Sequence, residues 1–159
     1  MPQEIERKFL VRSDEWRRHV VRSERLRDGL VAASDGRKVR VRLYEDRATL
    51  TVKSEQQRGR RAEFEYEVPR GHAEEMLALH CGRDRLEKTR HHVPFAGLDW
   101  EVDVYEGELA GMVLAEVELD RADREVALPG WAGEEVTGRP EYKKSAMLKA
   151  RRGQSEPAR

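Results

Sequence analysis

The sequence has little of what several protein classes depend on. Cys81 is the single cysteine among 159 residues, so neither an internal disulfide framework nor a cysteine-rich metal site can form. Apolar residues never run long enough to span a membrane, and no stretch has the pattern of a signal peptide. These absences predict a protein of the reducing cytoplasm without a membrane partner.

An excess of charge of one sign is also missing. Lys and Arg number 31, as do Asp and Glu, although charged residues make up 39% of the chain. A general nucleic-acid binder normally carries net positive charge, so we expect no nucleic-acid partner. The sequence has no glycine-rich phosphate loop, nucleophile elbow or zinc motif. Aromatic residues are only 6%, and Trp16, Trp100 and Trp131 are expected to pack the fold together.

What the sequence has in abundance is alternation of charged and apolar residues. In "EIERKFLV", Glu4, Glu6 and Lys8 fall on one face of a strand, opposite an apolar face. The pattern recurs in further short stretches, whose charged faces carry Lys38, Arg40 and Arg42; Lys53; Glu63 and Glu65; Lys88 and Arg90; Glu101 and Asp103; and Glu116 and Glu118. Short strands with close turns predict an antiparallel sheet or barrel.

Three helices are expected to pack against the outside of this sheet. Ser13 can cap a short helix that ends near His19, a second is expected over 71–82, and a third over 140–150. Cys81, at the end of the second, is expected to be a small buried apolar group, and Gly82 suits the residue after the helix.

The charged faces have two interpretations. They can form a solvated sheet surface with exposed ion pairs, which contribute only about 0–1 kcal/mol each. Alternatively, they can line the lumen of a closed barrel, where charges must be paired or bound to a ligand. Carboxylates on one side repel each other unless a divalent cation lies between them, and Arg and Lys match phosphate oxygens. A lumen of this kind suits a metal–polyphosphate complex.

The order of these stretches resembles a known family. "EIERKFLV" contains an ExExK pattern, followed by "VRVRL", "TLTVKSE", "RAEFEYEV", "RLEKTR", "WEVDVYEG", "LAEVEL" and "GEEVTGRPEYKKSAML", over about residues 3–150. Together they resemble the CYTH superfamily, the triphosphate tunnel metalloenzymes, and above all its short bacterial single-domain members. The resemblance implies an α+β, mostly β, fold: an eight-stranded antiparallel barrel with helices packed outside. The length of the chain predicts one domain, over 1–150, and the polar stretch that begins near Arg151 predicts a frayed tail over 151–159.

The resemblance also implies site roles. It implies that Glu4, Glu6, Glu116 and Glu118 bind the metal, which is Mg²⁺ with Mn²⁺ as an alternative. It implies that the triphosphate is bound by Lys8, Arg40, Arg42, Lys53, Lys88 and Arg90. Of these, Lys8, Arg42 and Lys88 are assigned to catalysis. Further tunnel acids are Glu63, Glu65 and Asp103.

The chain departs from its relatives at two positions. Leu30 replaces an aromatic hydroxyl, and Lys144 stands where relatives often have Asn. For Lys143 and Lys144, a position on the surface of a helix is favoured. Adjacent His91 and His92 point to opposite faces of a strand, so they are not expected to bind one metal ion.

The resulting prediction is a metal-dependent triphosphatase that hydrolyses inorganic tripolyphosphate or a related small-molecule triphosphate. Three alternatives stay open: a class IV adenylyl cyclase, a thiamine or nucleoside triphosphatase, and a non-catalytic polyphosphate-binding module. A homodimer is also left open. The full set of acids favours an enzyme, because a binding module could dispense with metal ligands.

Overall fold

The computed structural model describes residues 3–155, and the side chains of residues 3–153. Its strands are β1 (Gln3–Val11), β2 (Arg22–Ser34), β3 (Arg37–Leu43), β4 (Ala48–Lys53), β5 (Arg60–Val68), β6 (Arg85–Phe95), β7 (Leu98–Glu106), β8 (Val113–Glu118) and β9 (Ala132–Glu135). Its helices are α1 (Arg70–His80) and α2 (Lys144–Ser155), with short 3₁₀ turns η1 (Glu15–His19), η2 (Gly107–Leu109) and η3 (Pro140–Tyr142). None of the described helices is both long and apolar enough to cross a membrane.

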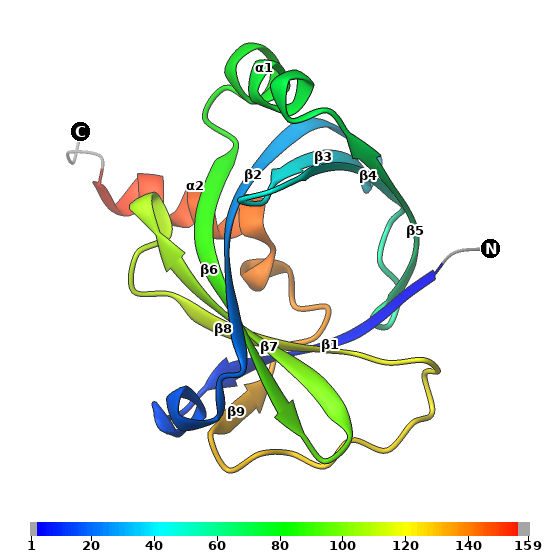
Figure 1. The fold of residues 1–159 in the computed structure, drawn as a ribbon, viewed down its shortest axis with the longest axis vertical. Helices are drawn as coiled ribbons and strands as arrows, with labels where there is room; N and C mark the ends of the chain where they lie inside the picture. Colours follow the sequence, from blue (N-terminus) through cyan, green and yellow to red (C-terminus); the bar gives the residue numbers. More distant parts are fainter. Residues whose placement is uncertain (1–2, 156–159) are drawn as a thin grey trace.

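Eight of the strands close into an antiparallel barrel, which confirms the predicted fold. Their order is β5-β4-β3-β2-β6-β7-β8-β1, and a β1–β5 pairing completes the ring, into which Figure 1 looks. β9 adds to β1 beyond the ring. A closed barrel leaves no unpaired edge and separates an inner from an outer face, so alternation along each strand sends one residue set into the lumen.

β1 is the seam of this barrel. Its first residues pair with β5, as in Ile5 opposite Arg60, and its later residues pair with β8, as in Glu6 opposite Glu118. Gly59 permits the approach of the β4–β5 turn: it has φ +77°, and a Cβ there would lie 2.8 Å from the Glu6 carbonyl oxygen. The Glu6 amide donates to the Gly59 carbonyl at 2.9 Å.

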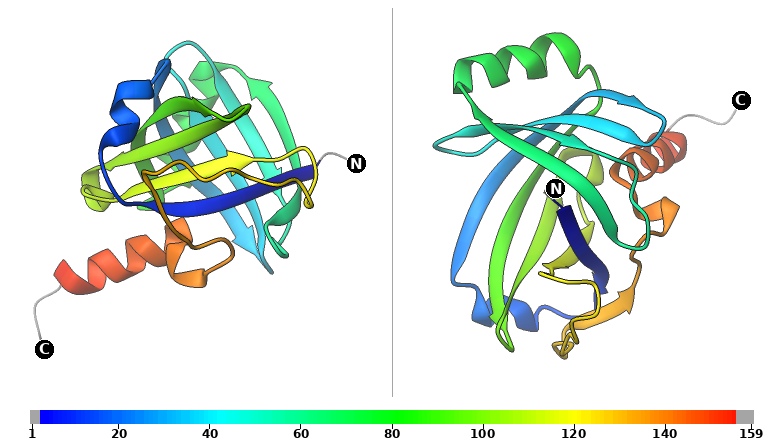
Figure 2. Two further views of the ribbon diagram at one scale, coloured as in Figure 1. Left: turned by 90° about the horizontal axis from the view of Figure 1, so that it is seen from below. Right: turned by 90° about the vertical axis from the view of Figure 1, so that its right-hand side faces the viewer.

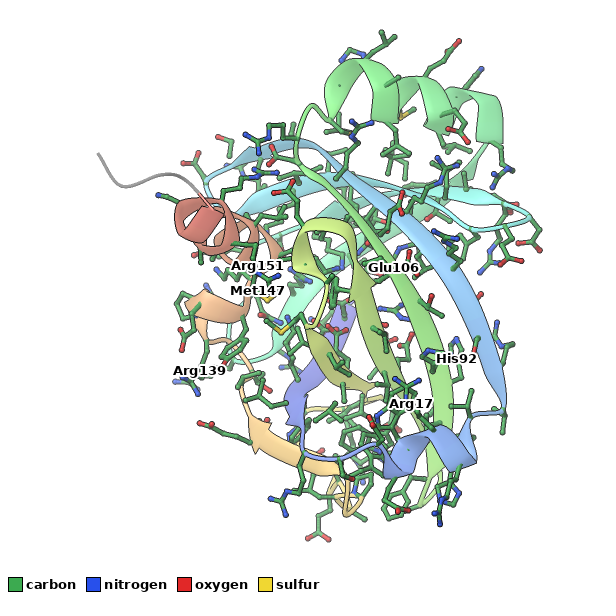
Figure 3. The ribbon with its side chains drawn as sticks, turned by 90° about the vertical axis from the view of Figure 1, so that its left-hand side faces the viewer. Arg17, His92, Glu106, Arg139, Met147 and Arg151 are labelled. Carbon is green, nitrogen blue, oxygen red and sulfur yellow. The ribbon has the colours of Figure 1, made fainter. Side chains whose placement is uncertain are left out.

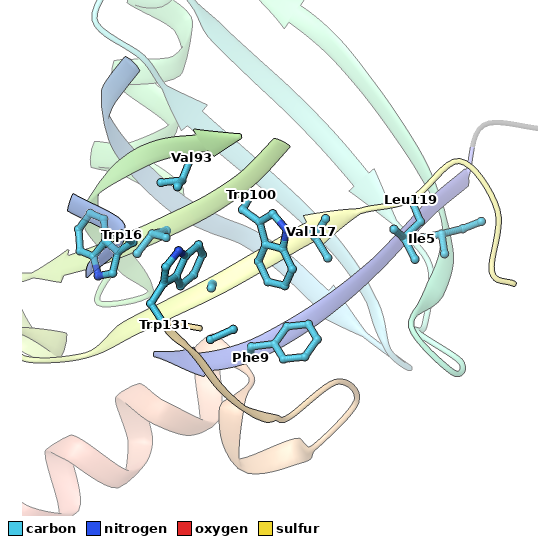
Figure 4. Close-up of a cluster of buried hydrophobic side chains, with 11 residues drawn as sticks. Ile5, Phe9, Trp16, Val93, Trp100, Val117, Leu119 and Trp131 are labelled. Atoms are coloured by element: carbon cyan, nitrogen blue, oxygen red, sulfur yellow. The ribbon is translucent and has the colours of Figure 1, made fainter. Parts of the chain in front are cut away.

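The outer face of β1, β7 and β8 carries the largest apolar cluster. Trp100 packs against Phe9 and Trp131, with ring centroids 5.2 and 5.5 Å apart. Figure 4 shows this cluster, with Trp16 of η1 at its edge. All three tryptophans are buried, so their predicted packing role is confirmed.

α1 covers the outer face of β3 and β4, as predicted. Ala73 and Leu77 of the helix are buried in one cluster with Val41 and Leu43. Cys81 is buried at the end of this helix, as expected, and Gly82 follows with φ +53°. The predicted start of the first short helix is wrong by one residue: Asp14, not Ser13, is the N-cap of η1.

α2 differs from its predicted place outside the sheet. Met147 and Leu148 of α2 are buried against Leu86, Tyr105 and Leu114, side chains that share the lumen face of their strands. The helix therefore closes one end of the barrel, and the segment leading into it is seen through the ring in Figure 1. It also continues past Arg151, where a frayed tail was expected to begin, to Ser155. Arg151 donates to the carbonyl oxygens of Glu108 and Ala110, which anchors this part of the helix.

Candidate functional site

The barrel contains a cavity of about 310 Å³ lined mostly by charged side chains. The predicted site residues that line it are Glu4, Glu6, Lys8, Arg40, Arg42, Lys53, Glu63, Glu65, Arg90, Glu116 and Glu118. Six strands contribute them, because each of these strands turns its charged face inward. The charged faces therefore enclose a lumen, and the alternative of a solvated sheet surface is wrong.

Carboxylates gather where β1 and β8 run side by side. Glu6 lies opposite Glu118, and Lys8 lies opposite Glu116. Burial, together with the negative charges of Glu116 and Glu4, raises the pKa of Glu6 to about 8. Burial and the neighbouring carboxylates also raise the pKa of Glu118. A cation bound among these carboxylates would stabilise the site, because it would relieve the repulsion between their negative charges.

The donor chemistry of this corner fits a hard divalent cation. Carboxylate oxygens are the protein ligands that Mg²⁺ takes, usually one or two at a time with water and phosphate oxygens. Within residues 3–155, no three His, Cys, Asp or Glu side chains are arranged to hold an ion as they stand. Glu4 instead contacts Arg61 at 3.0 Å and Lys53 at 3.3 Å. The residues fit a metal that shares its coordination with a ligand, and the assignment of Glu4, Glu6, Glu116 and Glu118 stays a prediction.

A cationic cluster faces the cavity near α2; we define it as Lys38, Arg40, Lys143 and Lys144. Burial, followed by repulsion from neighbouring cations, lowers the pKa of Lys38 to about 8. The same two causes lower the pKa of Arg40, and burial with nearby Lys88 holds the pKa of Lys144 well below its usual range. Among the described residues, the buried Arg40 Nε has no hydrogen-bond partner. In the part of the chain that the structure describes, the ion pair of this cluster is the one between Lys144 and Asp28, at 3.8 Å, so its cations outnumber the acids that contact them.

Arg42 is held by a buried acid that the sequence analysis did not single out. Its Nε and Nη2 donate to the two carboxylate oxygens of Asp28 at 2.6 and 2.8 Å. Burial opposes ionisation of Asp28, but Arg42 outweighs it and keeps the pKa of Asp28 well below its usual range. Asp28 falls in "RLRDGL" on the same face as Leu26 and Leu30, so an isolated acid between apolar residues was the available signal.

Lys88 and Asp103 lie beneath the cavity wall and do not line it. Lys88 has a fully buried side chain, and its Nζ donates to Asp103 at 2.8 Å. The same carboxylate accepts from Arg90 Nε at 2.9 Å and from Arg90 Nη2 at 3.0 Å. Asp103 therefore orients Arg90 toward the cavity and has its oxygens engaged. Contact of Lys88 with a phosphate stays a prediction.

Lys144 changes its predicted place. It lines the cavity and is half-buried, so the prediction of a helix surface position is wrong for it, whereas Lys143 borders the cavity but is exposed. Lys144 Nζ lies 3.8 Å from Asp28. The reason is the docking of α2 at the barrel end, which turns its first residues inward. Arg61, also missed, lines the cavity on the face of β5 that carries Glu63 and Glu65, a spacing that could have identified it.

His92 is engaged by acids at the other end of β6. Its two ring nitrogens lie 2.9 Å from Asp99 and 2.8 Å from Glu24. Figure 3 shows His92 at the far side of the barrel from Met147 of α2. Because both nitrogens face carboxylates, burial is outweighed and the pKa of His92 is raised. Both ring nitrogens of His92 therefore face carboxylate oxygens in this structure.

Comparisons with known proteins agree with this geometry. The CYTH domain family model matches residues 2–153. A protein from Acetivibrio thermocellus named inorganic triphosphatase is 39% identical over 149 residues, which cover 94% of this chain and 95% of that protein. An inorganic triphosphatase from Nitrosomonas europaea is 36% identical, over 91% of this chain and 95% of that protein. The crystal structure of the inorganic triphosphatase NE1496 superposes with a TM-score of 0.64 and 33% identity, covering 99% of both chains. Figure 2 gives two further views of the barrel to which these likenesses apply.

Proposed function

The chain belongs to the CYTH domain family, and from this premise we propose that it is an inorganic triphosphatase. It hydrolyses inorganic tripolyphosphate, or a closely related small-molecule triphosphate, inside its charged barrel. The observation that carries this proposal is the cationic cluster. Buried cations with lowered pKa values require a polyanion to balance them, and a chain of phosphates supplies several negative charges along one line.

The residues divide the work between two sides of the cavity. Arg40, Arg42, Arg90 and Lys53 would hold the phosphate oxygens and neutralise the charge that develops during phosphoryl transfer. Arg42 and Arg90 are already oriented by Asp28 and Asp103, so their guanidinium groups lose little freedom on binding.

The carboxylate side would hold the metal and the attacking water. Glu4, Glu6, Glu116 and Glu118 would hold Mg²⁺, or Mn²⁺ in its place, and further acids of the cavity, Glu63 and Glu65, would orient water. When bound, such a metal neutralises phosphate charge and lowers the pKa of a coordinated water.

We also propose a cytoplasmic location and no nucleic-acid partner. The support is one buried free cysteine and a net charge of zero. For a homodimer, a candidate surface is the outer face of β4 and β5, where Val52, Phe64 and Tyr66 are exposed.

The geometry favours the inorganic substrate over the alternatives. Among the described residues that line the cavity, Tyr44 is the single aromatic side chain. The guanidinium carbon of Arg47 already lies 3.7 Å from the centroid of this ring, so thiazolium or a purine base would compete with Arg47 for that face.

A substrate panel tests the proposal. Tripolyphosphate, ATP, GTP, thiamine triphosphate and pyrophosphate are each incubated with Mg²⁺ or Mn²⁺, and products are identified by ion chromatography. We expect orthophosphate plus pyrophosphate from tripolyphosphate as the fastest reaction. Cyclic AMP formed from ATP at a comparable rate would move the assignment to a cyclase. Binding without any turnover would move it to the polyphosphate-binding module.

Two glutamates and one control probe the metal side in the same assay. Glu116→Gln and Glu118→Gln should reduce turnover by orders of magnitude, because each removes a carboxylate from the metal corner. Glu125→Gln, an exposed residue outside the cavity, should behave as the parent. Normal turnover in both cavity variants would refute the metal assignment.

A further inference from the structure

Arg61 of β5 contacts two carboxylates of β1 inside the cavity. Its Nε donates to Glu4 Oε1 at 3.0 Å, and its Nη2 lies 3.8 Å from Glu6 Oε1. The Arg61 side chain is 15% exposed, and those of Glu4 and Glu6 are 12% and 13% exposed. These two acids are half of the set that the proposed function gives to the metal.

Each carboxylate oxygen of Glu4 already contacts a cation. Oε1 is engaged by Arg61, and Oε2 lies 3.3 Å from Lys53 Nζ. Lys53 has a second acid at equal distance, Glu63, and so keeps a partner if Glu4 turns away. In the described part of the chain, the ion pairs of Arg61 are with Glu4 and Glu6 alone.

From these contacts, we propose that Arg61 is an internal cation that competes with the divalent metal for Glu4 and Glu6, and that it binds substrate phosphate once displaced. The inference rests on the proposed function, because it needs the metal at these acids. Arg61 lines the same cavity as the cationic cluster, so a displaced guanidinium still faces the lumen. Its planar fork matches two phosphate oxygens. Metal binding thereby frees the Arg61 guanidinium to bind the substrate phosphate, so metal and substrate strengthen each other's binding.

The first measurement is metal affinity in the absence of any phosphate. Mn²⁺ is titrated calorimetrically into the parent and into Arg61→Gln. Competition predicts about tenfold tighter Mn²⁺ binding in the variant, the size expected for the loss of one close charge pair. A residue that only orients Glu4 and Glu6 as ligands predicts the opposite, because its loss would weaken metal binding.

Three control variants separate contact from general charge. Arg60→Gln removes an exposed charge from the neighbouring position of β5 and should leave Mn²⁺ affinity unchanged. Lys38→Met removes a charge from the same cavity without an ion pair to Glu4 or Glu6, and should tighten Mn²⁺ binding by much less. Arg61→Lys keeps the charge and, should Arg61→Gln fold poorly, still tests the contact: its Mn²⁺ affinity should fall between those of the parent and the Gln variant.

The second measurement is the coupling between metal and phosphate. A methylene-bridged, non-hydrolysable tripolyphosphate analogue is titrated with Mg²⁺ and with EDTA. Mg²⁺ should strengthen analogue binding in the parent, and Arg61→Gln should lose most of that gain while its affinity in EDTA stays near the parent value.

The outcomes distinguish this inference from the function on which it rests. If Glu4→Gln weakens Mn²⁺ binding but Arg61→Gln leaves it equal or weaker, competition is refuted and the metal assignment stands. If Glu4→Gln leaves Mn²⁺ binding unchanged, the metal is elsewhere, and both the assignment and the role of Arg61 fall.

Discussion

Replacing Asp103 by Asn tests how the cavity wall holds its cations. The carboxylate is 1% exposed and accepts hydrogen bonds from fully buried Lys88 and from Arg90. Among the described residues, Lys88 has no other acid within ion-pair distance. The substitution preserves shape and removes the charge that compensates both cations.

The burial of these side chains determines how much Asp103→Asn should lower the free energy of unfolding. Removing one partner of a buried ion pair destabilises a protein by about 3–5 kcal/mol, because the other charge stays buried without compensation. The Asn oxygen can still accept from one cation, so we expect the lower end, about 3 kcal/mol. For a domain of this size, each kcal/mol corresponds to about 2–4 °C, which predicts a melting temperature lower by roughly 6–12 °C.

The loss of stability caused by Asp103→Asn should become smaller as the pH rises from 7 to 10. Asp103 has a lowered pKa, because its two cations outweigh burial; its contribution is present above the unfolded pKa and is constant from pH 7 to 10. Burial lowers the pKa of Lys88, so the buried ammonium charge destabilises the folded state at pH values below that pKa. As the pH rises through the pKa of the folded state, Lys88 loses its proton and the destabilisation disappears. Without Asp103 this pKa falls further, and the difference between variant and parent should shrink toward pH 10.

Urea unfolding followed by tryptophan fluorescence, in EDTA and without phosphate, measures this difference at pH 7 and pH 10. Asp120→Asn is the matched control: its side chain is 67% exposed beside Arg124, so the free energy of unfolding should stay near that of the parent. An Asp103→Asn variant within 1 kcal/mol of the parent at pH 7 would refute the reasoning, where about 3 is expected. A difference that grows with pH would refute the account of Lys88.

Three further predictions concern the cavity itself. Because burial and neighbouring acids raise the pKa of Glu6 to about 8, Mg²⁺ affinity measured by calorimetry should rise with pH up to about pH 8; a flat profile would contradict it. Lys144→Met should stabilise the protein without ligand by about 1 kcal/mol, since a crowded, half-buried charge is lost and Asp28 keeps Arg42 as its partner; it should also raise the KM for tripolyphosphate, whereas exposed Lys149→Met should change neither. Tripolyphosphate should raise the melting temperature of the parent, and Arg42→Ala should blunt that shift; no shift in the parent, with and without Mg²⁺, would contradict polyphosphate binding.

Most of the fold and of the candidate site could be predicted from the alternation of charged and apolar residues, because in a closed barrel one of the two faces of each strand must face the lumen. Glu116 and Lys53 could be placed in the lumen from their strands alone, since each inward residue is two positions from the next. The sequence could not place α2. A pattern such as Met147-Leu148 indicates that a helix buries a stripe, but not which surface receives it. The inward position of Lys144 depends on that docking, and so it was missed.

Ion-pair partners were equally hidden from the sequence. Asp28 precedes Arg42 by 14 residues, and only the β2–β3 register brings them opposite each other. Arg61 reaches Glu4 through the pairing that closes the barrel, between strands far apart in the chain. Such contacts depend on register, which alternation leaves free to shift by two residues.

The double pairing of β1 has a consequence for how the protein is made. The strand that carries Glu4, Glu6 and Lys8 precedes both of its ring partners in the chain, and β8 completes only at Glu118. Until that segment is available, β1 cannot be held on both edges, and the carboxylates of the metal corner cannot lie side by side. Contacts this distant in sequence form slowly, because the intervening chain must first be ordered. The cavity should therefore appear in one late step, and a chain that stops before β8 should contain strands but no site.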